Sequence, residues 1–198
     1  MHRAPLRRYR AAALAVVAAF SVAGAAAPAA PADGASKSPL PYVRGGSRWL
    51  YDSNLGPATV TLDEYGVRDG ARLYRWEIRV LGVRMEEVLQ LRSSGLYTAN
   101  RTFLLPLGEF WALTFEPPEF TIALPLEVGR RWEARSPVKA GGSWGWTNVN
   151  GSVAAFEPVS VPAGQYMAYR IVLLRTDTWG SYVESLIWLD PEVGVIRA

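Results

Sequence analysis

Cysteine is absent from this chain of 198 residues, and the single histidine is His2. These absences exclude disulfide bonds, zinc sites built from Cys or His, and haem ligation through His from everything after position 2. They also exclude Ser-His-Asp and Cys-His nucleophilic catalysis. A covalent lipid anchor is excluded too, because lipid attachment to an exported bacterial precursor uses a Cys. We therefore expect no metal, no cofactor and no enzymatic activity of these kinds.

Acidic residues are absent from the first 32 positions, which have the pattern of a cleavable export signal. A positively charged start precedes a short apolar segment, and small residues follow. We expect a signal peptide at 1–32, cleaved after Ala25 or Ala32, and hence a secreted or periplasmic protein. General secretion and the twin-arginine route both stay open. An uncleaved membrane anchor is the alternative, since no charge interrupts residues 11–32. The basic residues of the start are Arg3, Arg7, Arg8 and Arg10.

Positive charge is also scarce once this leader is set aside. The whole chain has a net charge of +3, but without residues 1–32 it holds 17 basic against 18 acidic residues, a net charge of −1. A nearly neutral protein has no general attraction to phosphate backbones or anionic lipid. Nucleic acid is therefore not an expected partner.

The remaining sequence divides into two parts. Residues 33–41 are rich in Gly, Ser, Pro and Ala and are typical of a flexible linker. Residues 42–198 are enough for a single domain with its own core. No internal repeat is visible in this part.

Long helical patterns are missing from 42–198, where the apolar residues mostly recur with a period of two. Tyr74, Trp76, Ile78 and Val80 alternate with charged residues, and a hairpin to 83–91 should turn at Leu81-Gly82. The sequence predicts an all-β fold with at most minor helix: a curved antiparallel sheet forming a half-barrel or open barrel, or alternatively a β-sandwich. The other expected strands are 48–52, 58–65, 96–103, 109–115, 120–126, 143–149, 152–161, 166–177, 182–189 and 194–198, with a two-residue turn at Asn150-Gly151 between 149 and 152.

Aromatic side chains are the candidate binding residues. In Trp144-Gly145-Trp146 the two indoles should share one face of a strand, as a stacking platform for a ligand or as a pair of core residues. The stretch 103–128 is apolar and broken by prolines, which cannot donate to a ladder, so edge strands or flaps are expected there. Such flaps would either cover a hydrophobic ligand or close one end of the barrel. The residues predicted to line a ligand site are Trp76, Trp111, Phe115, Trp144 and Trp146.

Carboxylate pairs leave one enzymatic alternative, because glycoside hydrolysis runs on two Asp or Glu without histidine. Glu86 and Glu87 are neighbours on an expected strand and should point to opposite faces. The other pairs are Asp63-Glu64 and Asp190 with Glu192. Spacing alone selects no acid and no nucleophile among them.

Four segments, taken in order, resemble a family of uncharacterised exported bacterial β-proteins. They are Gly46–Tyr51, Leu124–Trp132, Val159–Ile171 with its Val-Pro-Ala-Gly turn, and Trp188–Arg197. The resemblance implies a curved sheet akin to the half-barrels of LolA-like periplasmic lipoprotein carriers, and no established catalytic residues. Many relatives carry a lipidated Cys, which this chain lacks.

The sequence thus favours a non-catalytic binding or carrier module for a hydrophobic ligand or an envelope partner. The expected ligand is a lipid, an acyl chain or a hydrophobic peptide. A structural or assembly protein of the cell envelope with a filled core is the alternative, and a carboxylate-dependent hydrolase is a third. A hollow concave face would favour the first hypothesis, and a packed face the second.

Overall fold

The computed structural model describes residues 22–25, 40, 43, 45–53, 55–105 and 110–198. The predicted signal peptide and linker lie outside the described residues, apart from 22–25 and Leu40. These described residues form twelve strands, and each pairs antiparallel with its neighbours. They are β1 (Val22–Ala25), β2 (Ser47–Ser53), β3 (Gly56–Arg68), β4 (Ala71–Val80), β5 (Val83–Arg92), β6 (Gly95–Leu104), β7 (Phe110–Ala123), β8 (Arg131–Ala140), β9 (Ser143–Val161), β10 (Gly164–Asp177), β11 (Tyr182–Asp190) and β12 (Gly194–Arg197).

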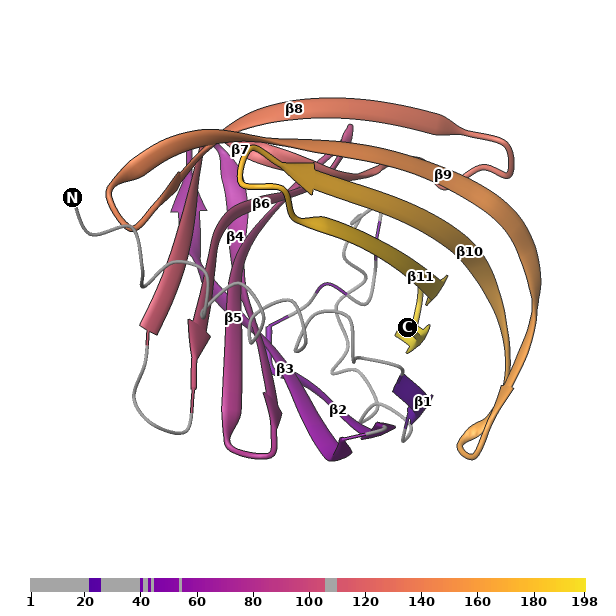
Figure 1. Cartoon of the computed structure of the whole chain (residues 1–198). Helices are drawn as coiled ribbons and strands as arrows, with labels where there is room; N and C mark the ends of the chain where they lie inside the picture. The colour runs from indigo at the N-terminus through magenta and orange to yellow at the C-terminus, as the bar shows by residue number, and fades with distance from the viewer. Residues whose placement is uncertain (1–21, 26–39, 41–42, 44, 54, 106–109) are drawn as a thin grey trace.

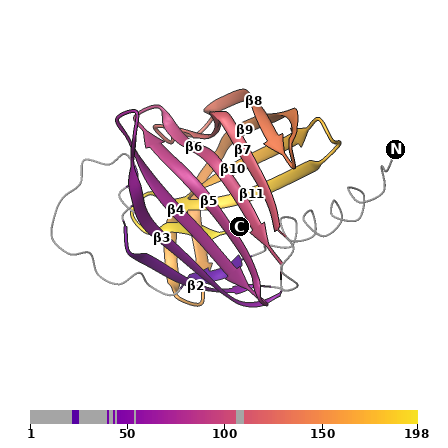
Figure 2. The ribbon, with the colours of Figure 1, turned by 90° about the vertical axis from the view of Figure 1, so that its left-hand side faces the viewer.

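Strands β2 to β12 follow one another in chain order within one sheet, which is curled into a half-barrel. Figure 1 shows β3 to β6 as one wall and β8 to β11 arching over to form the other. Seen from the side in Figure 2, β3 to β6 run side by side with a common tilt. β1 lies between β12 and β2, so the strand order closes on itself. The predicted all-β half-barrel is confirmed, and the described residues contain no helix.

The hairpin of β4 and β5 illustrates how local sequence sets the strands. Val80 pairs with Val83, and the two turn residues, Leu81 and Gly82, both have positive φ, at 46° and 77°. Such a two-residue turn matches the right-handed twist of the flanking strands. The alternation seen in the sequence follows this register, so the predicted hairpin is confirmed.

The predicted turn at Asn150-Gly151 is wrong, because β9 runs unbroken from Ser143 to Val161. Gly151 lies directly under the indole of Trp132 on β8, and a Cβ there would meet Trp132 Cε2 at 2.1 Å. The glycine therefore permits a close approach within a strand, which is the other common reason for Gly in a sheet.

The two strands expected around Pro117 and Pro118 form one strand, β7, which lies between β6 and β8. The prediction of edge strands is wrong for Leu113 and Thr114, which pair with both neighbouring strands, whereas the described residues Glu119–Ala123 pair with β6 alone. Thr98 pairs with Glu119 while Asn100 pairs with Thr114, so residues 115–118 bulge out of the ladder to β6. The bulge accommodates two residues that cannot donate to a ladder.

Most of the buried apolar side chains form one cluster inside the sheet. It includes Leu40, which is fully buried although the sequence places it in the predicted linker, and Val43. The gap between β2 and β12 is bridged by side chains as well as by β1. Trp49 Nε1 donates to the Val193 carbonyl oxygen (2.9 Å), and the Tyr51 hydroxyl donates to that of Val195 (2.8 Å). Among the described residues no helix is both long and apolar enough to cross a membrane.

Candidate functional site

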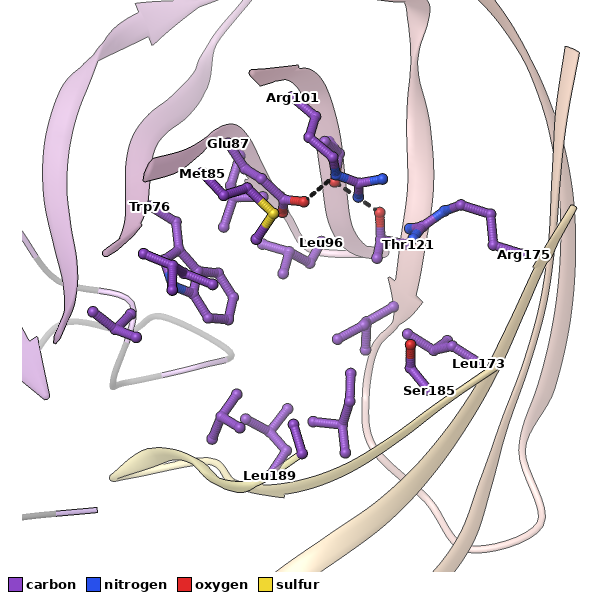
Figure 3. Close-up of a pocket in the computed structure, with 18 of the residues that line it drawn as sticks. Trp76, Met85, Glu87, Leu96, Arg101, Thr121, Leu173, Arg175, Ser185 and Leu189 are labelled. Atoms are coloured by element: carbon purple, nitrogen blue, oxygen red, sulfur yellow. Dashed lines mark hydrogen bonds and ion pairs between the residues drawn. The ribbon is translucent and has the colours of Figure 1, made fainter. Parts of the chain in front are cut away.

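A cavity of about 190 Å³ lies between the two walls of the half-barrel. One side is formed by β4, β5 and β6, and the other by β10, β11 and β12 (Figure 3). Trp76, Ile78, Met85, Ile187 and Val195 line it, and each of these apolar side chains is only half-buried. Since they point inward, the surface that they leave accessible faces the cavity. The interior is therefore hollow along this stretch.

A smaller chamber of about 60 Å³ adjoins the β6–β7 end of the interior. Trp111, Phe115 and Val183 contribute its apolar surface. Arg101 and Arg175 line both the chamber and the main cavity. The two guanidinium groups therefore stand where the two hollow spaces meet.

Arg101 is paired with Glu87, its direct neighbour across the β5–β6 ladder. Nε of Arg101 donates to Glu87 Oε1. Arg101 is buried, with 7% of its surface exposed, and the Glu87 side chain retains 15%. In Figure 3 the Glu87 carboxylate and the Arg101 guanidinium meet at the upper edge of the cavity.

Arg175 is paired with Glu119, which lies 56 residues earlier and three strands away in the sheet order. Nη2 and Nε of Arg175 donate to Glu119 Oε2, at 2.8 and 3.1 Å. Glu119 is completely buried, and its other oxygen, Oε1, has no hydrogen-bond partner. Arg175 leaves 18% of its side chain exposed.

The electrostatics keep these groups charged. Burial disfavours the ionised form of Glu119, but Arg175 and Arg101 outweigh it, and the pKa of Glu119 lies below its ordinary value. The Thr147 side chain lowers the pKa of Glu119 further, by less than the two arginines do. Burial likewise opposes the charge on Arg101, but Glu87 and Glu119 prevail and raise its pKa. Two cations and two anions thus share the end of the cavity with no net charge.

Neutral polar groups gather at the same end. The hydroxyls of Thr98 and Thr121 are 3.0 Å apart, and Ser185 lines the cavity from β11. Trp76 Nε1 is buried without a hydrogen-bond partner, although its ring forms part of the apolar wall. The cavity therefore has an apolar body and a polar, charged end, which is the usual composition of a small-molecule site.

The residues predicted to line a ligand site fall into three places. Trp76 lines the main cavity, and Trp111 and Phe115 line the smaller chamber. Trp144 and Trp146 share the outer face of β9, as their spacing predicts, and are 57% and 44% exposed. They lie neither in the core nor at the cavity.

The outer pair of tryptophans packs against basic side chains instead. Arg135 lies over the ring of Trp146, 4.5 Å from its centroid, and Lys139 lies 5.9 Å from that of Trp144. Both basic residues are on β8, beside β9. These are exposed cation–π contacts, each of modest strength.

Arg101, Glu119 and Arg175 were not among the sequence-based candidates, and Glu87 was considered only as half of a carboxylate pair. A signal was present in the alternation: Arg175 follows Ile171 and Leu173 at spacings of two, and Glu87 falls between Met85 and Leu89. A charge at an inward-facing position of a strand requires a partner inside the fold.

The carboxylate pairs considered for hydrolysis point elsewhere or have structural partners. Glu86 points away from Glu87, to the outer face, and accepts a hydrogen bond from Arg84 (2.8 Å). Asp190 accepts backbone N–H groups of Glu192 and Val193 in the turn before β12. Within the described part of the chain, no group of three or more potential metal ligands comes together.

Comparisons of the chain with protein-family models, with curated proteins and with solved structures find no match. The fold and the cavity are therefore the observations from which a function has to be argued.

Proposed function

We propose that this protein is a non-catalytic binding or carrier module that holds a hydrophobic ligand inside its half-barrel. The observation that carries the proposal is the cavity of about 190 Å³, whose wall is mostly apolar. An apolar cavity that is not filled by side chains forfeits packing energy, on the order of 24 cal/mol per Å³ in core-deletion mutants. A ligand that fills the space recovers this energy.

The volume limits the size of the ligand. Engineered apolar cavities of about 150 Å³ bind benzene, and drug-sized ligands occupy about 300–1,000 Å³. The cavity thus suits a compact apolar group, such as a single ring or a short acyl chain. A longer lipid would place only part of its chain in it.

Export is compatible with this role. A protein that works outside the cytoplasm and has no disulfide bonds is stabilised by its own hydrophobic core. A filled-core structural protein is disfavoured by the hollow interior, and a carboxylate hydrolase by the carboxylates that have structural partners. The proposed ligand is a lipid, an acyl chain or a hydrophobic peptide.

Titration with the compact neutral fluorophore 1-aminonaphthalene tests the proposal. We expect saturable binding with one site, and loss of binding in Ile187→Trp, because the indole occupies the cavity that Ile187 lines. The matched control is Leu186→Trp, since Leu186 is the adjacent residue on the outer face, 44% exposed. Absence of binding to the unmodified protein, or equal binding by both variants, contradicts the proposal.

A further inference from the structure

We propose that Arg101 and Arg175 recognise the oxygens of an acyl head group, a carboxylate or an ester carbonyl, on the ligand held in the main cavity. This inference rests on the proposed function and names the ligand class. It starts from position: the two arginines are the cationic residues that line the described cavity, and both stand at its polar end. An amphiphilic ligand with its chain among Trp76, Ile78 and Ile187 would place its head there.

The hydrogen-bond inventory of the two guanidinium groups leaves donors free. A guanidinium has five N–H donors. Arg101 uses Nε on Glu87, and no hydrogen bond to a described residue occupies its Nη1 and Nη2 groups. Arg175 gives Nε and Nη2 to a single oxygen of Glu119, and its Nη1 is without such a partner. Since both residues line the cavity, these N–H groups are available to an acceptor inside it.

The acceptors at this end are less available. Glu119 is completely buried and is not part of the cavity lining, so the side-chain carboxylate that lines the cavity is that of Glu87. The polar end therefore offers more donors than acceptors to a ligand. An oxygen acceptor matches this excess, whereas an ammonium head would bring further donors to a place that already holds two cations.

The two carboxylates have a structural role in the same arrangement. Without Glu87 and Glu119, two guanidinium groups would be buried side by side, at a cost that burial and like charge make prohibitive. With them, the cluster is neutral and the arginines are held in position before the ligand arrives. Preorganised donors of this kind bind without the cost of ordering side chains.

Competition against bound 1-aminonaphthalene with three probes of equal chain length tests the inference. The probes are octanoate, methyl octanoate and octylamine. We expect octanoate and methyl octanoate each to compete at least about tenfold better than octylamine, the ratio expected for one charge-assisted hydrogen bond. The two acyl probes distinguish a free acid from an ester as the preferred source of the head group.

A double variant, Glu87→Gln with Arg101→Gln, removes one ion pair without leaving a buried charge. We expect it to bind the fluorophore as before and to lose most of the preference for acyl probes. The matched control is Arg84→Gln with Glu86→Gln on the same strand, β5, which removes their mutual ion pair together with the pairs that Arg84 forms with Glu77 and Glu86 with Arg75. The control should keep the full preference.

The outcomes separate the two proposals. If the fluorophore binds but octylamine competes as well as octanoate, the head-group inference is overturned and the binding function stands. An unchanged preference in the Glu87→Gln/Arg101→Gln variant overturns it too. If the fluorophore does not bind at all, the proposed function fails, and the inference with it.

Discussion

The two ion pairs at the polar end of the cavity are built in different ways. Glu87 and Arg101 face each other across adjacent strands, 14 residues apart. Glu119 and Arg175 are 56 residues apart and come from β7 and β10, which are not neighbours in the sheet. The first pair needs one hairpin, whereas the second needs the sheet to curl until its walls approach each other. The Glu119–Arg175 pair therefore forms only when the sheet is curled into the barrel.

The surroundings of Glu119 explain how the long-range pair is supported. β7 pairs with β8 only where Leu113–Phe115 meet Val138–Ala140. Beyond this short ladder, Trp132 Nε1 donates to the Thr121 carbonyl oxygen (3.1 Å), and Arg175 reaches Glu119. Side chains thus connect the two walls where the backbone ladder is interrupted. The Glu87–Arg101 pair joins two strands whose backbone ladder continues past it, apart from the bulge at Ala99, so it does not have to connect the two walls.

The two pairs should differ most in the free energy of unfolding that is lost when one of the two carboxylates is replaced. Glu119→Gln keeps the shape of the side chain and leaves the partly buried charge of Arg175 without its paired carboxylate. We expect it to lower the free energy of unfolding by about 3–5 kcal/mol, as breaking a buried ion pair does. Urea denaturation monitored by tryptophan fluorescence measures the change. A loss below about 1 kcal/mol, typical of an exposed pair, would contradict the assigned role.

Gly151→Ala tests whether Trp132 helps to hold the Glu119–Arg175 pair in place. The new Cβ would lie 2.1 Å from Trp132, so the indole must move and its hydrogen bond to Thr121 is disturbed. Overpacking of this kind costs about 1–3 kcal/mol. The matched control is Gly142→Ala in the β8–β9 turn, where a Cβ meets nothing within 4 Å and only the positive φ, 85°, is strained. Unlike the control, Gly151→Ala should also change the near-ultraviolet circular dichroism of Trp132.

Glu87→Gln should cost less than Glu119→Gln. Arg101 keeps the favourable field of Glu119, and the Glu87 site is partly exposed, which screens the loss. We expect a decrease of about 1.5 kcal/mol in the free energy of unfolding, near the lower value for a hydrogen bond to a charged group. The same urea experiment gives the comparison. Equal losses for the two variants would remove the distinction between the local and the long-range pair.

The smallest expected effect is the change of the melting temperature with pH near neutrality. The pKa of Glu119 is lowered by folding, so its contribution to stability is complete above its ordinary value, 4.5, and is lost as the pH falls through the lower value of the folded state. The melting temperature should therefore change little on this account between pH 7 and about pH 5. Below that range it should fall less steeply in Glu119→Gln than in the unmodified protein. Parallel melting curves of the two proteins at acidic pH would contradict the assignment.

Several parts of the fold could be predicted because they depend on neighbouring residues. Alternation at 74–80, the turn at Leu81-Gly82 and the turn between Val161 and Gly164 are local, and the structure has each of them. The turn predicted at Asn150-Gly151 is wrong because Gly also occurs where a side chain packs closely against a strand. The side chain that packs against Gly151 is that of Trp132, which is distant in the sequence. Around Pro117 one continuous strand takes the place of the two expected strands, because a bulge accommodates both prolines.

The candidate site was predicted less completely than the fold. Trp76 was identified because it is an inward-facing aromatic residue of a regular strand. Arg101 was missed for a physical reason: continuing the register of the β5–β6 turn would place Asn100 opposite Glu87, and a bulge at Ala99 puts Arg101 there instead. A shift of one residue exchanges the two faces of a strand. Such a shift in register cannot be recognised from the hydrophobic pattern of the sequence.

The sequence by itself determined the class of the fold, the chemistry that the chain lacks and the inward direction of most apolar side chains. These depend on composition and on a period of two, which are local properties of a strand. Only the tertiary structure decided that the interior is hollow and that Glu119 meets Arg175 at the end of the cavity. Curvature and bulges set these features, and both arise from the accumulated twist and register of the whole sheet rather than from any one segment.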